Sequence, residues 1–92
     1  MLVTLEEVKQ YLRVDHDEED DLILDLMTSA QKLCMDILRI DDEELFETEH
    51  TQARIAVLYS IAYLYEHREK ADHHALTLTL RALLFGMRKD MF

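Results

Sequence analysis

Residues 53–65, ARIAVLYSIAYLY, decide the fold of this chain. Eleven of these thirteen residues are apolar, and only Arg54 and Ser60 interrupt the run. A surface helix carries one apolar stripe and one polar face, so a helix that is apolar on nearly every side needs cover from several directions. Spanning a bilayer takes about 20 residues, so the segment is too short for a membrane helix. The sequence therefore predicts a helix that either lies at the centre of a small bundle or shows part of its surface to another subunit.

Length and composition indicate a single helical domain over residues 1–92. The chain is 49% hydrophobic and 33% charged, with one glycine and no proline. An all-β design needs many tight turns, and a disordered chain has less apolar surface to bury. A domain of this size buries only about 60% of the surface of its unfolded chain, so such domains often gain further burial from partners or from copies of themselves.

The chain is strongly acidic, with a formal net charge of −10 from ten basic and twenty acidic residues. Like charge repels nucleic-acid phosphates and anionic membranes, so DNA reading and membrane binding are disfavoured. A single cysteine, Cys34, excludes a disulfide framework and fits a reducing compartment. Acidic residues lie within the first seven positions, and the N-terminal segment lacks the apolar core of a signal peptide. We therefore expect a soluble intracellular protein whose partner is apolar or oppositely charged.

Helical spacing of apolar residues predicts an all-α bundle of three main helices and a short C-terminal helix. Thr4 and Glu7 form a capping box that begins the first helix. Long i, i+3/i+4 stripes without glycine or proline carry the next two. The expected helices span about 4–13, 18–39, 49–69 and 79–88.

The segments between these helices contain turn and cap residues. Residues 40–50 are predicted to be a connector, either irregular or with a short helical turn, anchored by Leu45 and Phe46. Residues 71–75, ADHHA, are expected to end the third helix, and the chain is then expected to lead in extended form into the last one. The expected side-chain caps are Asp17 and Asp20 for the second helix, Thr48 or Thr51 for the third, and Thr77 or Thr79 for the fourth.

Tyrosines on the apolar segment favour a subunit interface. Tyrosine combines a large apolar ring with a polar tip and is enriched where proteins meet. Arg68 either pairs with neighbouring charges at the helix end or reaches the Arg13–Asp15 turn or another subunit. The candidate interface residues are Tyr59, Tyr63, Tyr65, Arg13 and Arg68.

Residues that could bind metal or carry catalysis form no recognisable motif. The first acidic run resembles the start of a calcium loop, but Asp20 stands where an EF-hand needs glycine and Leu26 where it needs the closing glutamate. Glu47 and His50 form one Glu-x-x-His pair, whereas a di-iron bundle needs two. Cys34 lies on the apolar stripe of the second helix, where a core residue is expected. We expect no metal, no cofactor and no enzymatic activity.

Two motifs, in this order, resemble the head–tail connector (adaptor) family of tailed phages and prophages. The first is Lys9–Asp15, KQYLRVD, which leads through an acidic run into a long helix. The second is Leu64–Glu69, LYEHRE, which closes the apolar helix. The similarity extends over residues 2–88. One departure is FGMR at 85–88, where the family pattern has a proline-containing close.

The resemblance implies a structural protein of virion assembly. Such a protein forms a closed homo-oligomeric ring that docks under the portal protein and receives a head-completion (stopper) or tail protein. Double-stranded DNA passes through the channel without specific binding, and a negative wall suits that passage because it prevents binding through counterion release. The expected location is the host cytoplasm during assembly and then the head–tail junction of the virion. The expected channel-facing acids are Asp17, Glu18, Glu19, Asp20 and Asp21, with the run at 41–49 as the alternative.

The alternative function is a stand-alone acidic helical module, a regulator or DNA mimic that occupies a basic site on one partner. Both functions use acidity, but they differ in self-association. A connector forms rings, whereas a module remains a monomer bound to its basic partner.

Overall fold

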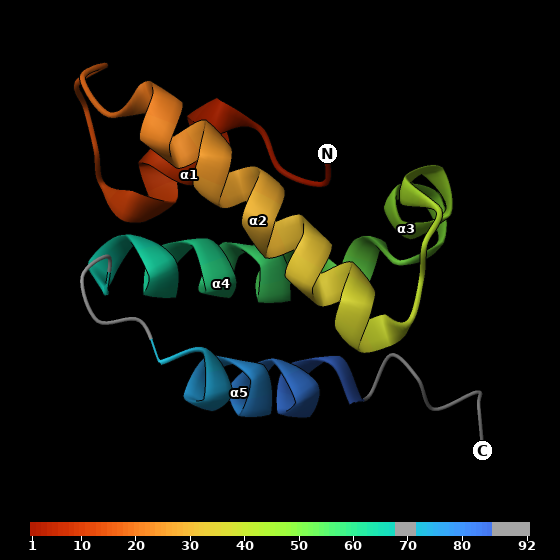
Figure 1. Cartoon of the computed structure of the whole chain (residues 1–92). Coiled ribbons are helices and arrows are strands. Elements are labelled where there is room, and N and C mark those ends of the chain that lie inside the picture. The colour runs from red at the N-terminus through yellow and green to blue at the C-terminus, as the bar shows by residue number, and fades with distance from the viewer. Residues whose placement is uncertain (68–71, 86–92) are drawn as a thin grey trace.

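The computed structural model describes residues 1–67 and 72–85, and the regular structure in these ranges is helical (Figure 1). The predicted all-α fold class is therefore confirmed. The elements are α1 (Leu5–Leu12), α2 (Asp20–Leu38), α3 (Glu43–Glu49), the short 3₁₀ helix η1 (Thr51–Ala53), α4 (Arg54–Glu66) and α5 (His73–Phe85).

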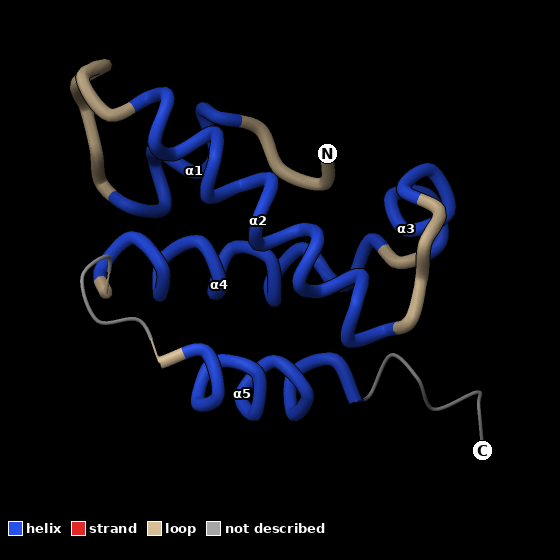
Figure 2. The backbone as a smooth tube through the Cα atoms, in the orientation of Figure 1, coloured by secondary structure: helices blue, strands red, loops and turns tan. Residues whose placement is uncertain are grey.

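The apolar helix α4 lies at the centre of the bundle. It contacts α1, α2 and α5, and α2 also packs on α1 and α5. Figures 1 and 2 show α2 crossing α4, and α5 returning antiparallel to α4. The residues that α4 turns toward its neighbours, among them Ala56, Val57, Ser60 and Ile61, are fully buried. Burial from three sides explains why so long a run of sequence lacks a polar face.

Local signals set both ends of α1. Thr4 Oγ1 accepts a hydrogen bond from the Glu7 amide at 3.2 Å, and Glu7 Oε1 accepts one from the Thr4 amide at 3.1 Å, which confirms the capping box. Arg13 ends the helix in the left-handed region, with φ 61°, and Arg39 ends α2 in the same way, with φ 60°. Both arginine amides donate to carbonyls of the last turn, which satisfies groups that a helix end otherwise leaves unpaired.

The predicted side-chain cap of α2 is wrong. The helix begins at Asp20 after Glu19, and no side chain caps its first turn. The two aspartates expected at the cap bind Lys9 of α1 instead, with Nζ 2.7 Å from Asp17 and 2.8 Å from Asp20. An ion pair to a neighbouring helix replaces the local cap because α1 folds back beside this turn.

The connector after α2 contains a separate helix. Asp42 Oδ1 accepts a hydrogen bond from the Leu45 amide at 3.2 Å and begins α3. Phe46 anchors α3 as predicted, since it is fully buried, but Leu45 is 44% exposed and does not.

The third long helix starts later than predicted, at Arg54 rather than near residue 49. It continues directly from η1, so it has no side-chain cap, and the expected caps Thr48 and Thr51 are wrong. Thr48 Oγ1 donates to the Glu44 carbonyl at 2.9 Å within α3. A 3₁₀ lead-in satisfies the first amides of α4 where a polar cap was expected.

The last helix starts earlier than predicted, at His73 rather than near residue 79. Asp72 Oδ1 accepts a hydrogen bond from the Ala75 amide at 2.9 Å, so Asp72 begins the helix and the expected caps Thr77 and Thr79 are wrong. Residues 74–78 are helical rather than extended. The parts of the predicted helices that fall on 68–69 and 86–88 lie outside the described residues. The buried stripe of α5 is Leu76, Leu80 and Leu84.

Candidate interaction surfaces

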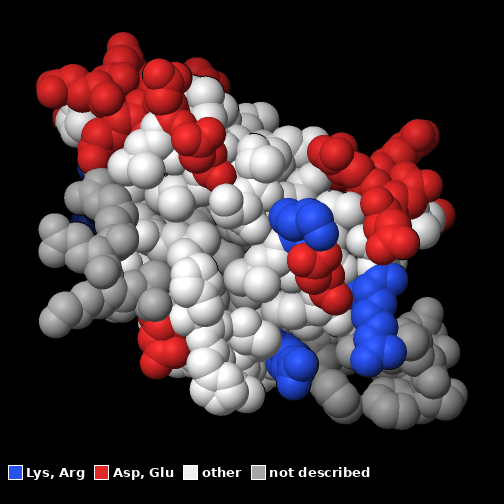
Figure 3. Space-filling model, in the orientation of Figure 1, with Lys and Arg blue, Asp and Glu red and all other residues white. Residues whose placement is uncertain are grey.

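Carboxylates gather at two places on the surface (Figure 3). One group lies over the turn from α1 to α2, and the other lies over α3. On the face shown, mostly uncharged atoms separate the two groups. The first acidic cluster comprises Asp15, Asp17, Glu18, Glu19, Asp20 and Asp21, and the second comprises Asp41, Asp42, Glu43, Glu44, Glu47 and Glu49.

Part of the first acidic cluster is neutralised within the chain. Lys9 binds Asp17 and Asp20, and these hydrogen bonds raise the pKa of Lys9. The bond from Lys9 likewise lowers the pKa of Asp17. Glu19 accepts a hydrogen bond from the Tyr65 hydroxyl. Glu18 and Asp21 are exposed and, unlike Asp17 and Asp20, form no ion pair within the described residues.

The second acidic cluster is fixed to the bundle by Gln31, which is only 3% exposed. Its Nε2 donates to Glu47 at 3.0 Å and to Glu43 at 3.3 Å. The amino group of Met1 also pairs with Glu47. This amino group and Gln31 lower the pKa of Glu47. Sequence reasoning missed Gln31, because an amide on an apolar stripe gives no sign of its partners.

The outer face of α4 carries an exposed apolar stripe. Ile55 is 68% exposed and Tyr59, one turn later, is 36% exposed. Ala62 and Glu66 continue the same face at helical spacing. Beside Ala62 and Glu66, a hollow of about 450 Å³ opens between α4 and α1, where it is also lined by Tyr11. The apolar segment is thus central, as one of the two alternatives raised by its sequence has it, and the described residues leave one of its sides exposed.

The other two candidate tyrosines make contacts within the chain. Tyr63 Oη lies 3.3 Å from the amide and 3.4 Å from the carbonyl of Asp72, and its ring stacks on His67 with centroids 4.2 Å apart. Tyr65 donates to Glu19. Both tyrosines are half-buried and pack against the core. Tyr59 is therefore the most accessible of the three.

One of the two candidate interface arginines lies among the described residues. Arg13 is exposed at the end of α1, directly before the first acidic cluster. Arg68 lies outside the described residues.

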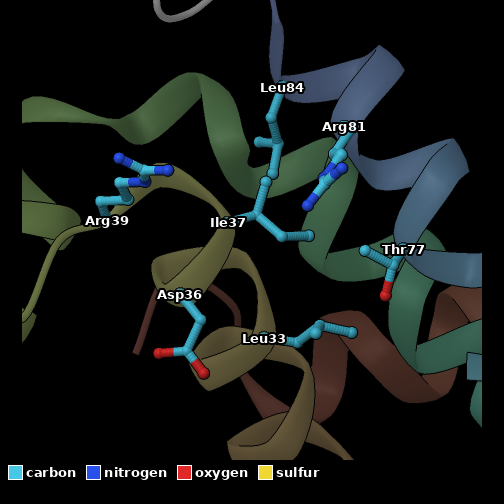
Figure 4. Close-up of a pocket in the computed structure, with 7 residues that line it drawn as sticks. All are labelled: Leu33, Asp36, Ile37, Arg39, Thr77, Arg81 and Leu84. Atoms are coloured by element: carbon cyan, nitrogen blue, oxygen red, sulfur yellow. The ribbon is translucent and has the colours of Figure 1, made fainter. Parts of the chain in front are cut away.

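A pocket of about 550 Å³ lies between the C-terminal end of α2 and α5 (Figure 4). Figure 4 shows the side chains of Arg39 and Arg81 on either side of Ile37 and Leu84. Within the described part of the chain, neither guanidinium has a carboxylate at ion-pairing distance. Asp36, at the edge, pairs with Lys32. We call this site the arginine pocket, and its lining is Leu33, Asp36, Ile37, Arg39, Thr77, Arg81 and Leu84.

The residues considered above as possible metal ligands or catalytic groups make contacts that stabilise the fold. Cys34 is fully buried, as expected of a core residue, and burial raises the pKa of its thiol to about 11. Glu47 forms an ion pair with the N-terminal amino group and accepts a hydrogen bond from Gln31. The ring of His50 stacks on the ring of Phe46, with centroids 6.4 Å apart. Among the described residues, no group of three or more His, Cys, Asp or Glu side chains could hold a metal ion. The helices in these ranges are all too short or too polar to cross a membrane.

A helical bundle with two acidic clusters, an exposed apolar stripe and a pocket lined by arginines is suited to contacts with other proteins. A family model described as phage gp6-like head-tail connector protein matches residues 2–91. The chain therefore belongs to the phage gp6-like head–tail connector family, a structural family of virion assembly, and the predicted resemblance is confirmed. No curated protein and no solved structure matches the chain.

Proposed function

We propose that this protein is the subunit of a closed ring that docks under the portal protein and continues the DNA channel toward the tail. The observation that carries the proposal is the family match over residues 2–91, nearly the whole chain. A head-completion (stopper) protein or a tail protein would bind the opposite side of the ring. The protein would be in the host cytoplasm during assembly and at the head–tail junction of the virion afterwards.

The outer stripe of α4 supports contact between subunits. Removing a large apolar side chain from water stabilises an association by about 1.5–3 kcal/mol. Ile55, 68% exposed in the monomer, and Tyr59 would supply such burial. Tyr65 and Arg13 flank the first acidic cluster and would widen the contact, and Tyr63 and Arg68 complete the proposed interface set.

The acidic clusters support a channel that does not retain DNA. A protein binds duplex DNA mainly by releasing counterions through lysine and arginine contacts to phosphates. A wall of carboxylates makes no such contacts, so DNA would pass without specific binding. One of the two clusters would face the channel, either Asp17–Asp21 or residues 41–49.

The experiment combines the purified chain with its portal protein and examines the particles by negative-stain electron microscopy and mass photometry. The portal is included because assembly can require it as a template. The expected result is a ring of connector subunits coaxial with the portal. A chain that remains a monomer with the portal and binds a basic protein tightly would contradict the proposal and favour the stand-alone acidic module.

A further inference from the structure

We propose that the arginine pocket receives the first acidic cluster of a second copy of this chain, with Arg39 and Arg81 pairing with Glu18 and Asp21 of that copy. The inference rests on the proposed ring and specifies which two surfaces meet in it.

The arginine pocket has the composition of a site for an acidic segment. Leu33, Ile37 and Leu84 supply apolar walls, and Arg39 and Arg81 stand on either side (Figure 4). A guanidinium is a planar fork of donors that matches the two oxygens of a carboxylate. Apolar surface beside the fork excludes water and strengthens each charge pair.

Like Arg13, these two arginines have no ion-pair partner among the described residues, whereas the other described lysine and arginine side chains do. Lys9 binds Asp17 and Asp20, Lys32 binds Asp36, and Arg54 binds Glu7. Arg39 and Arg81 have no carboxylate at ion-pairing distance within residues 1–67 and 72–85. In a chain with twenty acidic residues, two unpaired guanidinium groups at one pocket are a local charge opposite to that of the whole molecule.

The carboxylates that match this pocket lie at the other end of α2. The helix has 19 residues, so its ends are about 28 Å apart, and Asp21 cannot reach Arg39 of the same copy. Glu18 and Asp21 are exposed and have no ion pair in the described chain, unlike their neighbours Asp17 and Asp20. Opposite charges at opposite ends therefore meet only between copies.

The placement also favours the first acidic cluster over the second. A closed ring needs a head-to-tail contact between two different surfaces of the subunit. The first acidic cluster and the arginine pocket lie at opposite ends of α2 and satisfy this need. The second cluster starts two residues after Arg39, at the same end of the molecule, and its exchange between two copies would give a two-fold dimer instead. The contact would occupy the first cluster at the subunit boundary and leave the second for the channel.

Disulfide trapping tests the contact directly. The full-length variant carrying Asp21→Cys and Arg81→Cys is mixed with the portal protein, oxidised mildly, and separated by electrophoresis without reductant. Native Cys34 is buried, so it remains silent. We expect a ladder of disulfide-linked connector subunits. The matched control carries Glu44→Cys and Arg81→Cys and should give no ladder. A ladder from the control alone, or from neither variant, would overturn the inference.

Charge reversal separates this inference from the proposed ring. Arg39→Glu with Arg81→Glu, and Glu18→Lys with Asp21→Lys, should each weaken self-association at least about tenfold. In a mixture, a ring in which the two variants alternate has complementary charges at every contact, so mixing them should restore rings. If the wild type forms rings and the reversed variants form them equally well, the ring stands and the inference fails. If the wild type forms no ring with the portal, the proposed function itself fails.

Discussion

Cys34 and Ser60 meet where α2 crosses α4, with Sγ 3.8 Å from Oγ. The Ser60 hydroxyl donates to the Ala56 carbonyl at 2.8 Å, so its single proton is in use. The thiol of Cys34 is therefore the donor in the contact between the helices. Both residues are fully buried, and Ala30 and Ala56, one turn before each, are buried too. Small side chains bring the two helices close together at the centre of the bundle.

Enlarging this crossing should destabilise the fold. Ser60→Leu adds volume where α2 leaves none, and overpacking of this kind costs about 1–3 kcal/mol in the free energy of unfolding. The matched control, Ser60→Ala, removes the hydrogen bond to the Ala56 carbonyl and the weaker contact with the Cys34 thiol, and should cost about 1 kcal/mol. Urea unfolding followed by circular dichroism measures both. Equal stability of the two variants would show that the crossing has room to spare.

The Cys34 thiol should react slowly in the native protein. Burial raises its pKa from 9.0 to about 11, which lowers the thiolate fraction about a hundredfold at pH 8. The folded protein favours the neutral form of the Cys34 thiol. The contribution of the buried neutral thiol to the free energy of unfolding is therefore complete below pH 9 and is lost as the pH rises toward 11. Reaction with a thiol-specific chromogenic reagent at pH 8, with and without urea, measures the difference. A native rate close to the unfolded rate would contradict burial of this side chain.

Acid should weaken the two ion-paired ends of the molecule. Lys9 lowers the pKa of Asp17, and the N-terminus and Gln31 lower the pKa of Glu47. A carboxylate whose pKa is lowered by folding stabilises the folded state at pH values above its ordinary pKa, which is 3.8 for Asp17 and 4.5 for Glu47. This stabilisation is lost as the pH falls through the pKa of the folded state. The urea midpoint should therefore fall between pH 6 and pH 3. Asp17→Asn should reduce this dependence, and an unchanged slope in that variant would contradict the role of the Lys9 pair.

Tyr59→Asp should separate assembly from folding. The side chain is 36% exposed on the outer stripe, so a carboxylate there is tolerated by the monomer but not by an apolar interface. We expect unchanged helicity by circular dichroism and loss of rings on the portal by electron microscopy. Ser29→Asp, also exposed but on α2, is the control and should assemble normally. If the Tyr59→Asp variant still forms rings, the outer stripe of α4 is not part of the interface.

Truncating the anchor of α3 should have a large effect, and truncating its neighbour a small one. Phe46 is fully buried, so Phe46→Ala should lower the free energy of unfolding by about 3–5 kcal/mol. Leu45 is 44% exposed, so Leu45→Ala should change it by about 0.5 kcal/mol or less. Thermal and urea unfolding of both variants provide the comparison. Similar losses would mean that both side chains are buried.

Where signals are local, the sequence predicts this fold well. The capping box at Thr4 and Glu7 gives the start of α1, and the apolar stripe gives α2 almost in full. The start of α5 could not be predicted, because the alternation Leu76, Leu78, Leu80 resembles an extended segment. Packing decides there, since Leu76, Leu80 and Leu84 at helical spacing are buried by α2 and α4 while Leu78 remains 52% exposed.

The candidate surfaces were predictable only in part. Tyr59 followed from residue type and position, and both acidic clusters followed from charge runs. The arginine pocket could not be predicted in this way. Arg39 and Arg81 are far apart in the chain, and they line the same pocket only because α5 packs against α2. The partners of Lys9 and Gln31 depend in the same way on helix–helix packing.

The left-handed end of α2 has a consequence for recognition. The Arg39 amide donates to the Asp36 carbonyl at 3.1 Å, and the Ile40 amide donates to the Met35 carbonyl at 2.9 Å, so the main chain at Arg39 is held on both sides. A residue whose backbone is already immobilised has only its side-chain torsions left to lose on association. The conformational entropy spent in ordering this guanidinium is accordingly smaller than for an arginine on a loose loop, and the pocket is preorganised on that side before any ligand arrives.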